Sequence, residues 1–278
     1  MIKLRNWLLI ATTSCSVWIG TALTLLPQMA AAQDMRVYTT VAAVEENREQ
    51  VVSHSLTLFH AGKVYDYMED VGEVVILEPA RNRFIILGGN YTATDVPFSE
   101  VHQFLDAAQS KADEYLEEVQ KSGDANQLKR SLAIAFQMKP DLTARFNEAE
   151  QTLQIQGEFL TYQVHAAAAP SPEFLRQYLD YADWAARLNY VLHPHSAYPT
   201  ARIRLDEELK ERGVIPVTVE LSAKLDQPVR LKARHDYRGL QAIDRQLINR
   251  WEQQLLAPEI HWVSFHEYQQ KLLTAQAR

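Results

Sequence analysis

A change in hydrophobic period near Pro97 limits what this chain can fold into. From residue 36 to residue 96 the chain reads as short runs typical of strands, and turns that contain glycine, proline or asparagine separate the runs. Short alternating runs with short connections are typical of antiparallel hairpins. After Ser99 the apolar residues recur every three or four positions as far as Val119, which predicts an amphipathic helix with Ser99 as its cap. We therefore expect an antiparallel meander with a long helix lying on it.

The rest of the chain mixes both periods. Alternation predicts further strands at 132–138, 152–156, 159–167, 214–223 and 229–235. Ser171-Pro172-Glu173 is a strong helix start, and helices are expected over 172–192, 200–212, 240–255 and 265–275. Together these elements predict an α+β fold, in which a curved antiparallel sheet, a half-barrel-like meander, is covered by several α-helices. Because no repeat or flexible linker interrupts residues 33–278, we expect one domain with a helical C-terminal extension over 239–278.

The N-terminus has the three parts of a secretory signal peptide. Lys3 and Arg5 precede an apolar stretch, residues 7–26, and a run of alanines ends at Ala32. We expect residues 1–32 to be removed, which would leave an exported protein, periplasmic or extracellular, without stable membrane insertion. An uncleaved membrane anchor is the alternative, since about 20 apolar residues can span a bilayer. A lipid attached to Cys15 fits less well, because a long apolar run still follows this residue.

The cysteine content shows which bonds can stabilise the exported part, and the net charge shows which kinds of partner it can bind. Cys15 is the only cysteine, so cleavage would leave neither disulfides nor thiolate metal ligands, and the exported part must be stabilised by its core. Removal of Lys3 and Arg5 leaves 26 basic against 35 acidic residues, a formal net charge of −9. Nucleic-acid binding needs clustered lysine and arginine, so we expect no nucleic-acid partner.

Several strand pairs resemble a known family. The segments 63–67, 72–79 and 83–87, followed late in the chain by 213–219, look like the LolA-like superfamily of periplasmic lipoprotein-carrier half-barrels. This resemblance lies in the order of the elements. It implies a strongly curved antiparallel sheet with helices over its concave side, where the carriers hold acyl chains. The segment 172–213 and the C-terminal helices have no clear counterpart, and these helices could fill the hollow.

Aromatic residues in the predicted helix 172–192 are the candidates for a ligand site. Phe174 and Tyr178 keep the helical spacing of the apolar stripe and also fit a core. Tyr181 and Trp184 lie off this stripe, where they could line an apolar pocket. We therefore predict a hydrophobic ligand site that involves Tyr178, Tyr181 and Trp184.

Histidines after this helix are the candidates for a metal site. His193 and His195 flank a proline, and His261 and His266 could complete a set of imidazole ligands. A solvated turn is the simpler interpretation, because nothing in the spacing brings the two pairs together. We expect no cofactor.

Carboxylates gather at 69–73 and at 206–208, in a predicted turn and on a predicted helix surface, where solvated charge is the expected interpretation. The chain has no G-x-S-x-G, H-E-x-x-H or glycine-rich phosphate loop. We therefore favour a non-enzymatic exported protein that binds a hydrophobic ligand, such as a lipid, or a lipoprotein-like envelope component. One alternative is a structural or interaction module that docks an envelope protein through its acidic helix faces or tail helices. A hydrolase with an unrecognised site, in which His193 or His195 meets a carboxylate, is a further alternative.

Overall fold

The computed structural model describes residues 34–276 apart from residues 47, 124, 195 and 226–227, so the predicted signal peptide lies outside the described residues. The strands are β1 (Met35–Glu45), β2 (Arg48–His60), β3 (Lys63–Met68), β4 (Glu73–Glu78), β5 (Arg83–Leu87), β6 (Thr92–Pro97), β7 (Thr143–Asn147), β8 (Thr152–Gln156), β9 (Leu160–Ala168), β10 (Val214–Lys224), β11 (Pro228–Gly239) and β12 (His261–Val263). The helices are α1 (Phe98–Ser122), α2 (Ala125–Met138), α3 (Pro172–Leu192), α4 (Thr200–Arg212), α5 (Ala242–Leu256) and α6 (Phe265–Gln276).

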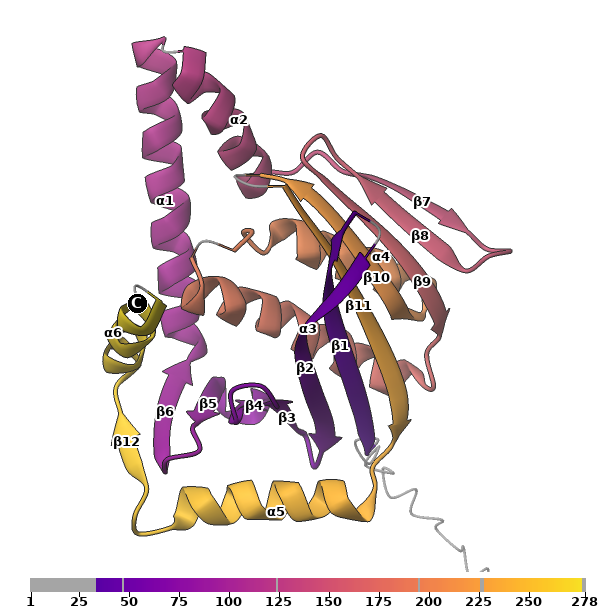
Figure 1. The fold of residues 1–278 in the computed structure, drawn as a ribbon, viewed down its shortest axis with the longest axis vertical. Coiled ribbons are helices and arrows are strands. Elements are labelled where there is room, and N and C mark those ends of the chain that lie inside the picture. Colours follow the sequence, from indigo (N-terminus) through magenta and orange to yellow (C-terminus); the bar gives the residue numbers. More distant parts are fainter. Residues whose placement is uncertain (1–33, 47, 124, 195, 226–227, 277–278) are drawn as a thin grey trace, which may run out of the picture. The chain divides into compact units, whose positions relative to one another are not determined.

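In this part of the chain, one open sheet contains all twelve strands (Figure 1). Their order is β12-β6-β5-β4-β3-β2-β1-β11-β10-β9-β8-β7. Each neighbouring pair is antiparallel except β12 and β6, which are parallel. The predicted α+β fold with a curved antiparallel sheet is therefore confirmed. No helix among the described residues combines the length and the apolar character needed to cross a membrane.

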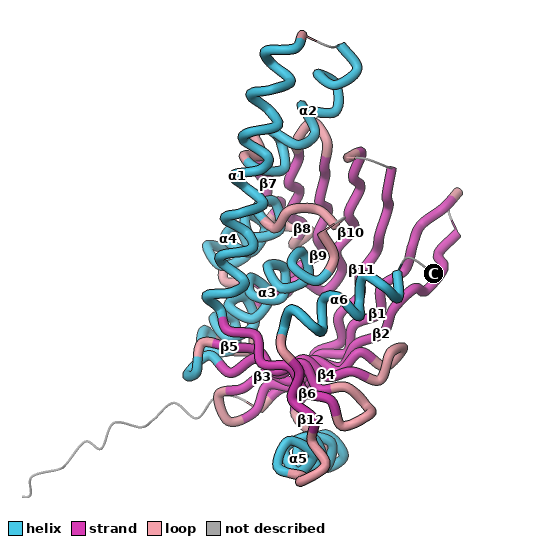
Figure 2. The backbone as a smooth tube through the Cα atoms, turned by 90° about the vertical axis from the view of Figure 1, so that its left-hand side faces the viewer, coloured by secondary structure: helices cyan, strands magenta, loops and turns pink. Residues whose placement is uncertain are grey.

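Both faces of the first half of the sheet are buried. On the inner face, Phe59 and Phe84 pack in a core shared with α1, α3 and α4. On the outer face, Leu58 and Ile76 pack against Ile248 and Trp251 of α5. Figure 2 shows α5 on one side of the strands, with α3 and α4 on the other. Burial on both faces explains why β4 and β5 read as nearly continuous apolar runs in place of a strict alternation.

The signals that start and stop α3 and α4 act as predicted. The Ser171 side chain accepts a hydrogen bond from the Phe174 backbone N–H at 3.1 Å, and Pro172 occupies the first turn of α3. Gly213 ends α4 in a left-handed conformation at φ +70°, which a residue with a side chain rarely adopts. Helices α3 and α4 therefore run between well-defined ends across the inner face of the sheet (Figure 1).

Two predictions about the middle of the chain are wrong. Residues 132–138 belong to helix α2, although a strand was expected there. Alanines lie between the larger apolar residues of this short run, so its period is ambiguous, and packing of α2 against α1 decides in favour of a helix. Helix α1 in turn contacts α2, α3 and β6, the strand next to the edge strand β12, so it does not lie along the sheet as expected. Strands β7 and β12 had no clear sequence signal.

Candidate ligand-binding pocket

A pocket of about 410 Å³ opens between α3 and the turn that joins β2 to β3. The sheet supplies Phe59, Val64 and Leu77 to its apolar wall, and α3 supplies Tyr181 and Trp184. Pockets for small molecules usually measure about 300–1,000 Å³, so this volume suits one small ligand. Residues of the β2–β3 turn and of helix α3 therefore line the space together.

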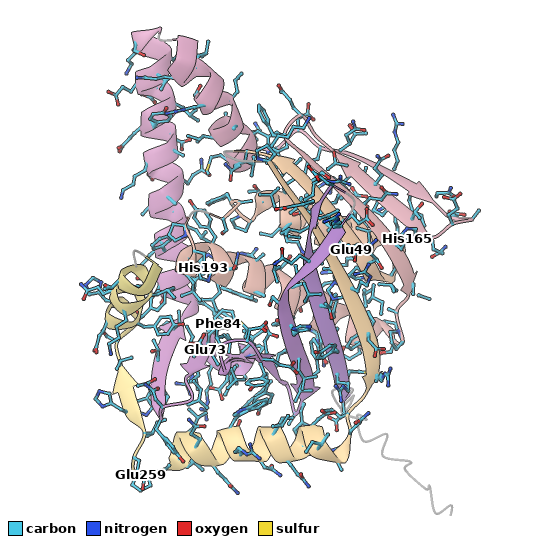
Figure 3. The ribbon with its side chains drawn as sticks, in the orientation of Figure 1. Glu49, Glu73, Phe84, His165, His193 and Glu259 are labelled. Carbon is cyan, nitrogen blue, oxygen red and sulfur yellow. The ribbon has the colours of Figure 1, made fainter. Side chains whose placement is uncertain are left out.

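The aromatic side chains of this wall are held by ring contacts. The Tyr181 ring meets Phe59 edge to face, with centroids 5.8 Å apart and an angle of 87° between the planes. The Trp184 ring stacks on Phe98, the first residue of α1, with centroids 3.5 Å apart. Phe84 points into the space between the sheet and α3 in Figure 3, and its ring centroid lies 6.1 Å from that of Trp184. The wall is therefore preformed.

The three aromatic residues predicted for a ligand site have different positions. Tyr181 and Trp184 line the pocket. Tyr178 is only 5% exposed and packs in the inner core against Phe174 and Tyr237. The position of Tyr178 on the apolar stripe of α3 accounts for this difference. Ligand binding by these residues stays a prediction.

A buried polar contact fixes the far end of the Tyr181 side chain. Its hydroxyl is hydrogen-bonded to Asp66 of β3, and the Thr57 hydroxyl donates to Asp66 Oδ1 at 2.9 Å. Burial raises the pKa of Asp66, although both hydrogen bonds act in the opposite direction. The sequence did not reveal this contact, because Asp66 reads as an ordinary residue on an exposed strand face.

Charged side chains surround the mouth of the pocket. Arg176 pairs with Glu173 at 2.7 Å and with Asp180 at 3.2 Å. Arg187 lies 4.0 Å from Asp183, and its guanidinium carbon is 5.5 Å from the centre of the Trp184 ring. Lys63 completes the set of cations. The lining therefore holds three cations, Lys63, Arg176 and Arg187, against two acids, Asp180 and Asp183, although acids exceed bases in the whole chain.

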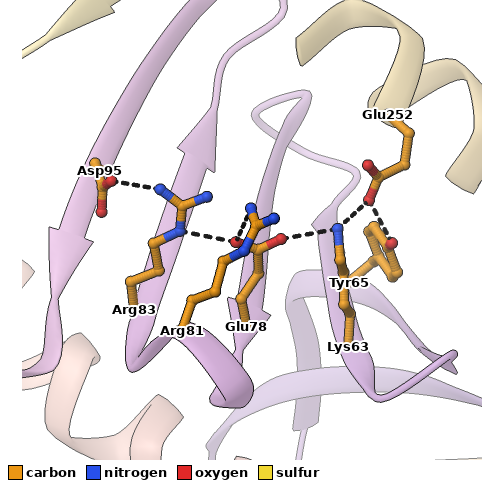
Figure 4. Close-up of polar contacts among 7 residues, drawn as sticks. All are labelled: Lys63, Tyr65, Glu78, Arg81, Arg83, Asp95 and Glu252. Carbon is orange, nitrogen blue, oxygen red and sulfur yellow. Dashed lines mark hydrogen bonds and ion pairs between the residues drawn. The ribbon is translucent and has the colours of Figure 1, made fainter. Parts of the chain in front are cut away.

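Lys63 is held by two carboxylates in a network that joins the sheet to α5 (Figure 4). Its Nζ lies 2.8 Å from Glu78 and 2.8 Å from Glu252 of α5, and the Tyr65 hydroxyl donates to Glu252 at 2.6 Å. Arg83 pairs with Glu78 at 2.7 Å. Burial would raise the pKa of Glu78, but Lys63 and Arg83 outweigh this effect and hold it below its usual value. The position of Lys63 at the pocket therefore depends on outer-face residues.

A histidine and an acid also meet at the pocket mouth. His60 lines the pocket, and its Nδ1 lies 2.8 Å from Asp34 Oδ1. Arg245 of α5 lies 2.8 Å from the other oxygen of Asp34. Because Asp34 and His60 are far apart in the sequence, only the pairing of β1 with β2 brings them together. No local sequence motif predicts this contact.

The acids of α4 correct an expectation of solvated charge. Asp206 and Glu208 are 2% and 3% exposed. Arg202 Nε donates to Asp206 Oδ2 at 3.1 Å, while Arg204 and Arg212 both pair with Glu208. Arginines four residues away are the signal that sequence reasoning overlooked, since such spacing supplies the partners that buried acids need. In the other cluster, Glu73 is partly buried and accepts from the Tyr268 hydroxyl at 3.0 Å.

The predicted metal residues do not form a described site. His193 ends α3 at the surface, beside α1 in Figure 3, and its backbone N–H donates to the Asn189 carbonyl at 2.8 Å. His195 lies outside the described residues. His261 and His266 are exposed on β12 and α6. Within the described ranges, no group of three or more histidine, aspartate or glutamate side chains could hold a metal ion.

The tail of the chain exposes some apolar side chains, as a module that docks a partner through its tail helices would require. Ile243 and Leu256 of α5 are 53% and 84% exposed, and Trp262 of β12 is 46% exposed. A docking role for this region stays a prediction.

Comparison with protein-family models gives no match, and comparison with curated proteins also gives none. The resemblance to the lipoprotein carriers therefore stays a prediction, and the pocket is the feature of the molecule that bears on function.

Proposed function

We propose that this protein is a non-enzymatic, exported binding protein that holds a small amphipathic anion in the pocket between α3 and the β2–β3 turn. The observation that carries this proposal is the composition of the lining. Phe59, Tyr181 and Trp184 offer an apolar surface for the body of a ligand. Lys63 and Arg187 at the rim would attract an anionic group. Export is inferred from the basic, apolar and alanine-rich segments of the N-terminus.

The packing of the inner face limits the size of the ligand. Phe174, Leu205 and Leu209 of α3 and α4 are fully buried against the sheet. These helices occupy the space in which a lipoprotein carrier would hold several acyl chains. A relationship to the carriers would therefore concern the scaffold, while the ligand would be a single small molecule in the side pocket.

A fluorescent amphipathic anion tests the proposal directly. We expect residues 33–278 to bind anilinonaphthalene sulfonate with an increase in its fluorescence, because its rings match the aromatic wall and its sulfonate matches the cations. Trp184→Ala should weaken binding about tenfold, since the variant removes much of the apolar contact surface. Mass spectrometry of an organic extract of the purified protein would identify a natural ligand.

Trp262→Ala is the matched control, because Trp262 is a half-exposed tryptophan on β12, away from the pocket lining. This variant should bind the probe as the wild type does. Thermal unfolding would establish that Trp184→Ala is folded at the assay temperature. Equal probe affinity of wild type and folded Trp184→Ala would contradict the proposed pocket.

A further inference from the structure

The carboxyl groups of Asp183 and Asp206 meet at the wall of the pocket, and one oxygen of each is buried without a hydrogen-bond donor in the part of the chain that the structure describes. Asp183 of α3 lines the pocket, and Asp206 of α4 is 2% exposed. The two side chains are hydrogen-bonded to each other. Oδ1 of each is buried and accepts no hydrogen bond from any donor in the described residues. An ionised carboxylate can only accept hydrogen bonds, so this contact requires a proton on one of the two groups.

The surroundings do not neutralise the pair completely. Arg202 Nη2 lies 2.9 Å from Asp206 Oδ1, yet it does not point at this oxygen with hydrogen-bond geometry. Arg187 stays 4.0 Å from Asp183, and Asp180 adds a negative charge one turn earlier on α3. His60, Lys63, His102 and Arg176 line the same pocket as Asp183. The titratable groups around Arg202 and Asp206 are Tyr162 of β9, Tyr178 of α3, and His235 and Tyr237 of β11.

These neighbours stay uncharged near neutral pH. Burial raises the pKa of Tyr162 to about 12 and lowers the pKa of His235 to about 4. Burial also raises the pKa values of Tyr178 and Tyr237. For Asp206, burial raises the pKa to about 7, and the nearby Asp183 acts in the same direction while Arg202 opposes it. Burial raises the pKa of Asp183 as well. The pair is therefore the group in this cluster that titrates close to neutrality.

We propose that Asp183 and Asp206 share one proton, and that this proton determines whether the pocket accepts an anion. The proposal rests on the binding function proposed above and adds its charge specificity. With the proton in place, the pair carries one negative charge, which the arginines can balance. Loss of the proton adds a second negative charge to the pair, which adjoins the pocket through Asp183, and this charge repels an anionic ligand. Affinity for an amphipathic anion should then fall as the pH rises through neutrality.

Two probes of similar size and different charge test the coupling. Anilinonaphthalene sulfonate keeps its negative charge between pH 5.5 and pH 8.5, and phenylnaphthylamine is uncharged over this range. We expect the dissociation constant of the sulfonate to be about fivefold to tenfold higher at pH 8.5, the effect of one added charge several ångströms away at the dielectric constant of a protein surface. The affinity for phenylnaphthylamine should stay the same at both pH values.

Variants assign the effect to the pair. Asp206→Asn removes the shared proton, so the affinity for the sulfonate should depend on pH much less than in the wild type, and charge changes elsewhere in the lining would account for the remainder. Glu207→Gln is the matched control, because Glu207 is an exposed neighbour on α4 outside the pocket, and this variant should keep the wild-type pH profile. Asp183→Asn provides a second test if Asp206→Asn folds poorly. Carboxyl carbon chemical shifts of the wild-type protein would report the shared proton independently, as a coupled titration of both groups.

The outcomes separate the two proposals. Binding of the sulfonate with equal affinity at pH 5.5 and pH 8.5 would overturn the coupling and leave the pocket in place. The same pH profile for both probes, or an unchanged profile in folded Asp206→Asn and Asp183→Asn, would also overturn it. Absence of binding of either probe at pH 5.5 would overturn the binding function itself.

Discussion

Asp206 makes the clearest contribution of a single residue to the pH dependence of stability. Its pKa is raised by burial to about 7 in the folded protein, whereas an aspartate in an unfolded chain titrates near 3.9. Between about pH 4 and pH 7 the folded state thus binds a proton that the unfolded state has lost. The contribution of Asp206 to stability is fully present below pH 4, decreases as the pH rises to about 7, and is constant above.

Asp206→Asn should remove this dependence. We expect the free energy of unfolding of the variant, relative to the wild type, to increase by roughly 2–3 kcal/mol between pH 5 and pH 8. Urea unfolding at a series of pH values measures this difference. The same series on Glu207→Gln should give a difference from the wild type that does not change with pH. A constant difference for Asp206→Asn would mean that Asp206 is ionised throughout the range.

The residues of the pocket were partly accessible to sequence reasoning. Tyr181 and Trp184 could be chosen because their phase on α3 places them beside the apolar stripe. The pairing of His60 with Asp34 could not be foreseen, because it depends on which strands pair, whereas the burial of Asp206 had a sequence signal that was overlooked. A charged residue on a helix reads as solvated unless its arginine partners, here Arg202 for Asp206, are counted with it.

At the scale of elements, the β8–β9 turn packs so tightly on α2 that Gly157 cannot accept a side chain without adjustment. A Cβ atom at this position would lie 2.7 Å from the Phe136 ring and 2.8 Å from Leu142. The Phe136 ring is itself buried, and its centroid lies 5.4 Å from the centroid of the Phe159 ring, so the Phe136 side chain has little freedom to move. Gly157→Ala should therefore reduce the free energy of unfolding by about 1–3 kcal/mol, as measured by urea unfolding.

Gly239→Ala is the natural comparison. No atom lies within 4 Å of a Cβ atom at this end of β11, and the backbone is not left-handed there. This variant should be neutral or more stable by up to about 1 kcal/mol, because alanine restricts the unfolded chain. Equal stability of the two variants would show that α2 can move away from the turn.

Elements with a strong signal were predicted well. The paired turns of β2 to β6 and the caps of α3 and α4 are local features, so the sequence near each boundary was sufficient. Helix α2 was missed because its short apolar run fits either period, and its pairing with α1 is a tertiary contact.

At the scale of the whole molecule, the sheet needs cover on both faces, and α5 supplies it on the outer one. Trp251 is 6% exposed, and its ring stacks on Tyr65 with centroids 6.0 Å apart. Trp251→Ala should cost about 3–5 kcal/mol in unfolding free energy, because it leaves a cavity between α5 and the strands. Ile243→Ala, a change at an exposed position of the same helix, should cost less than about 0.5 kcal/mol. Equal losses would indicate that α5 is not held by its buried face.

Sequence reasoning was sufficient for the features that depend on neighbouring residues: the antiparallel hairpins from β2 to β6, the apolar faces of α1 and α3, and the absence of disulfides in the expected exported part. Long-range packing was needed to establish that β11 joins β1, that α3 and α4 fill the inner face, and that a side pocket remains at α3. The physical reason is the range of the interactions. Turn geometry and hydrophobic period act over a few residues, whereas the order of strands and the burial of charged side chains follow from packing between segments that are distant in the sequence.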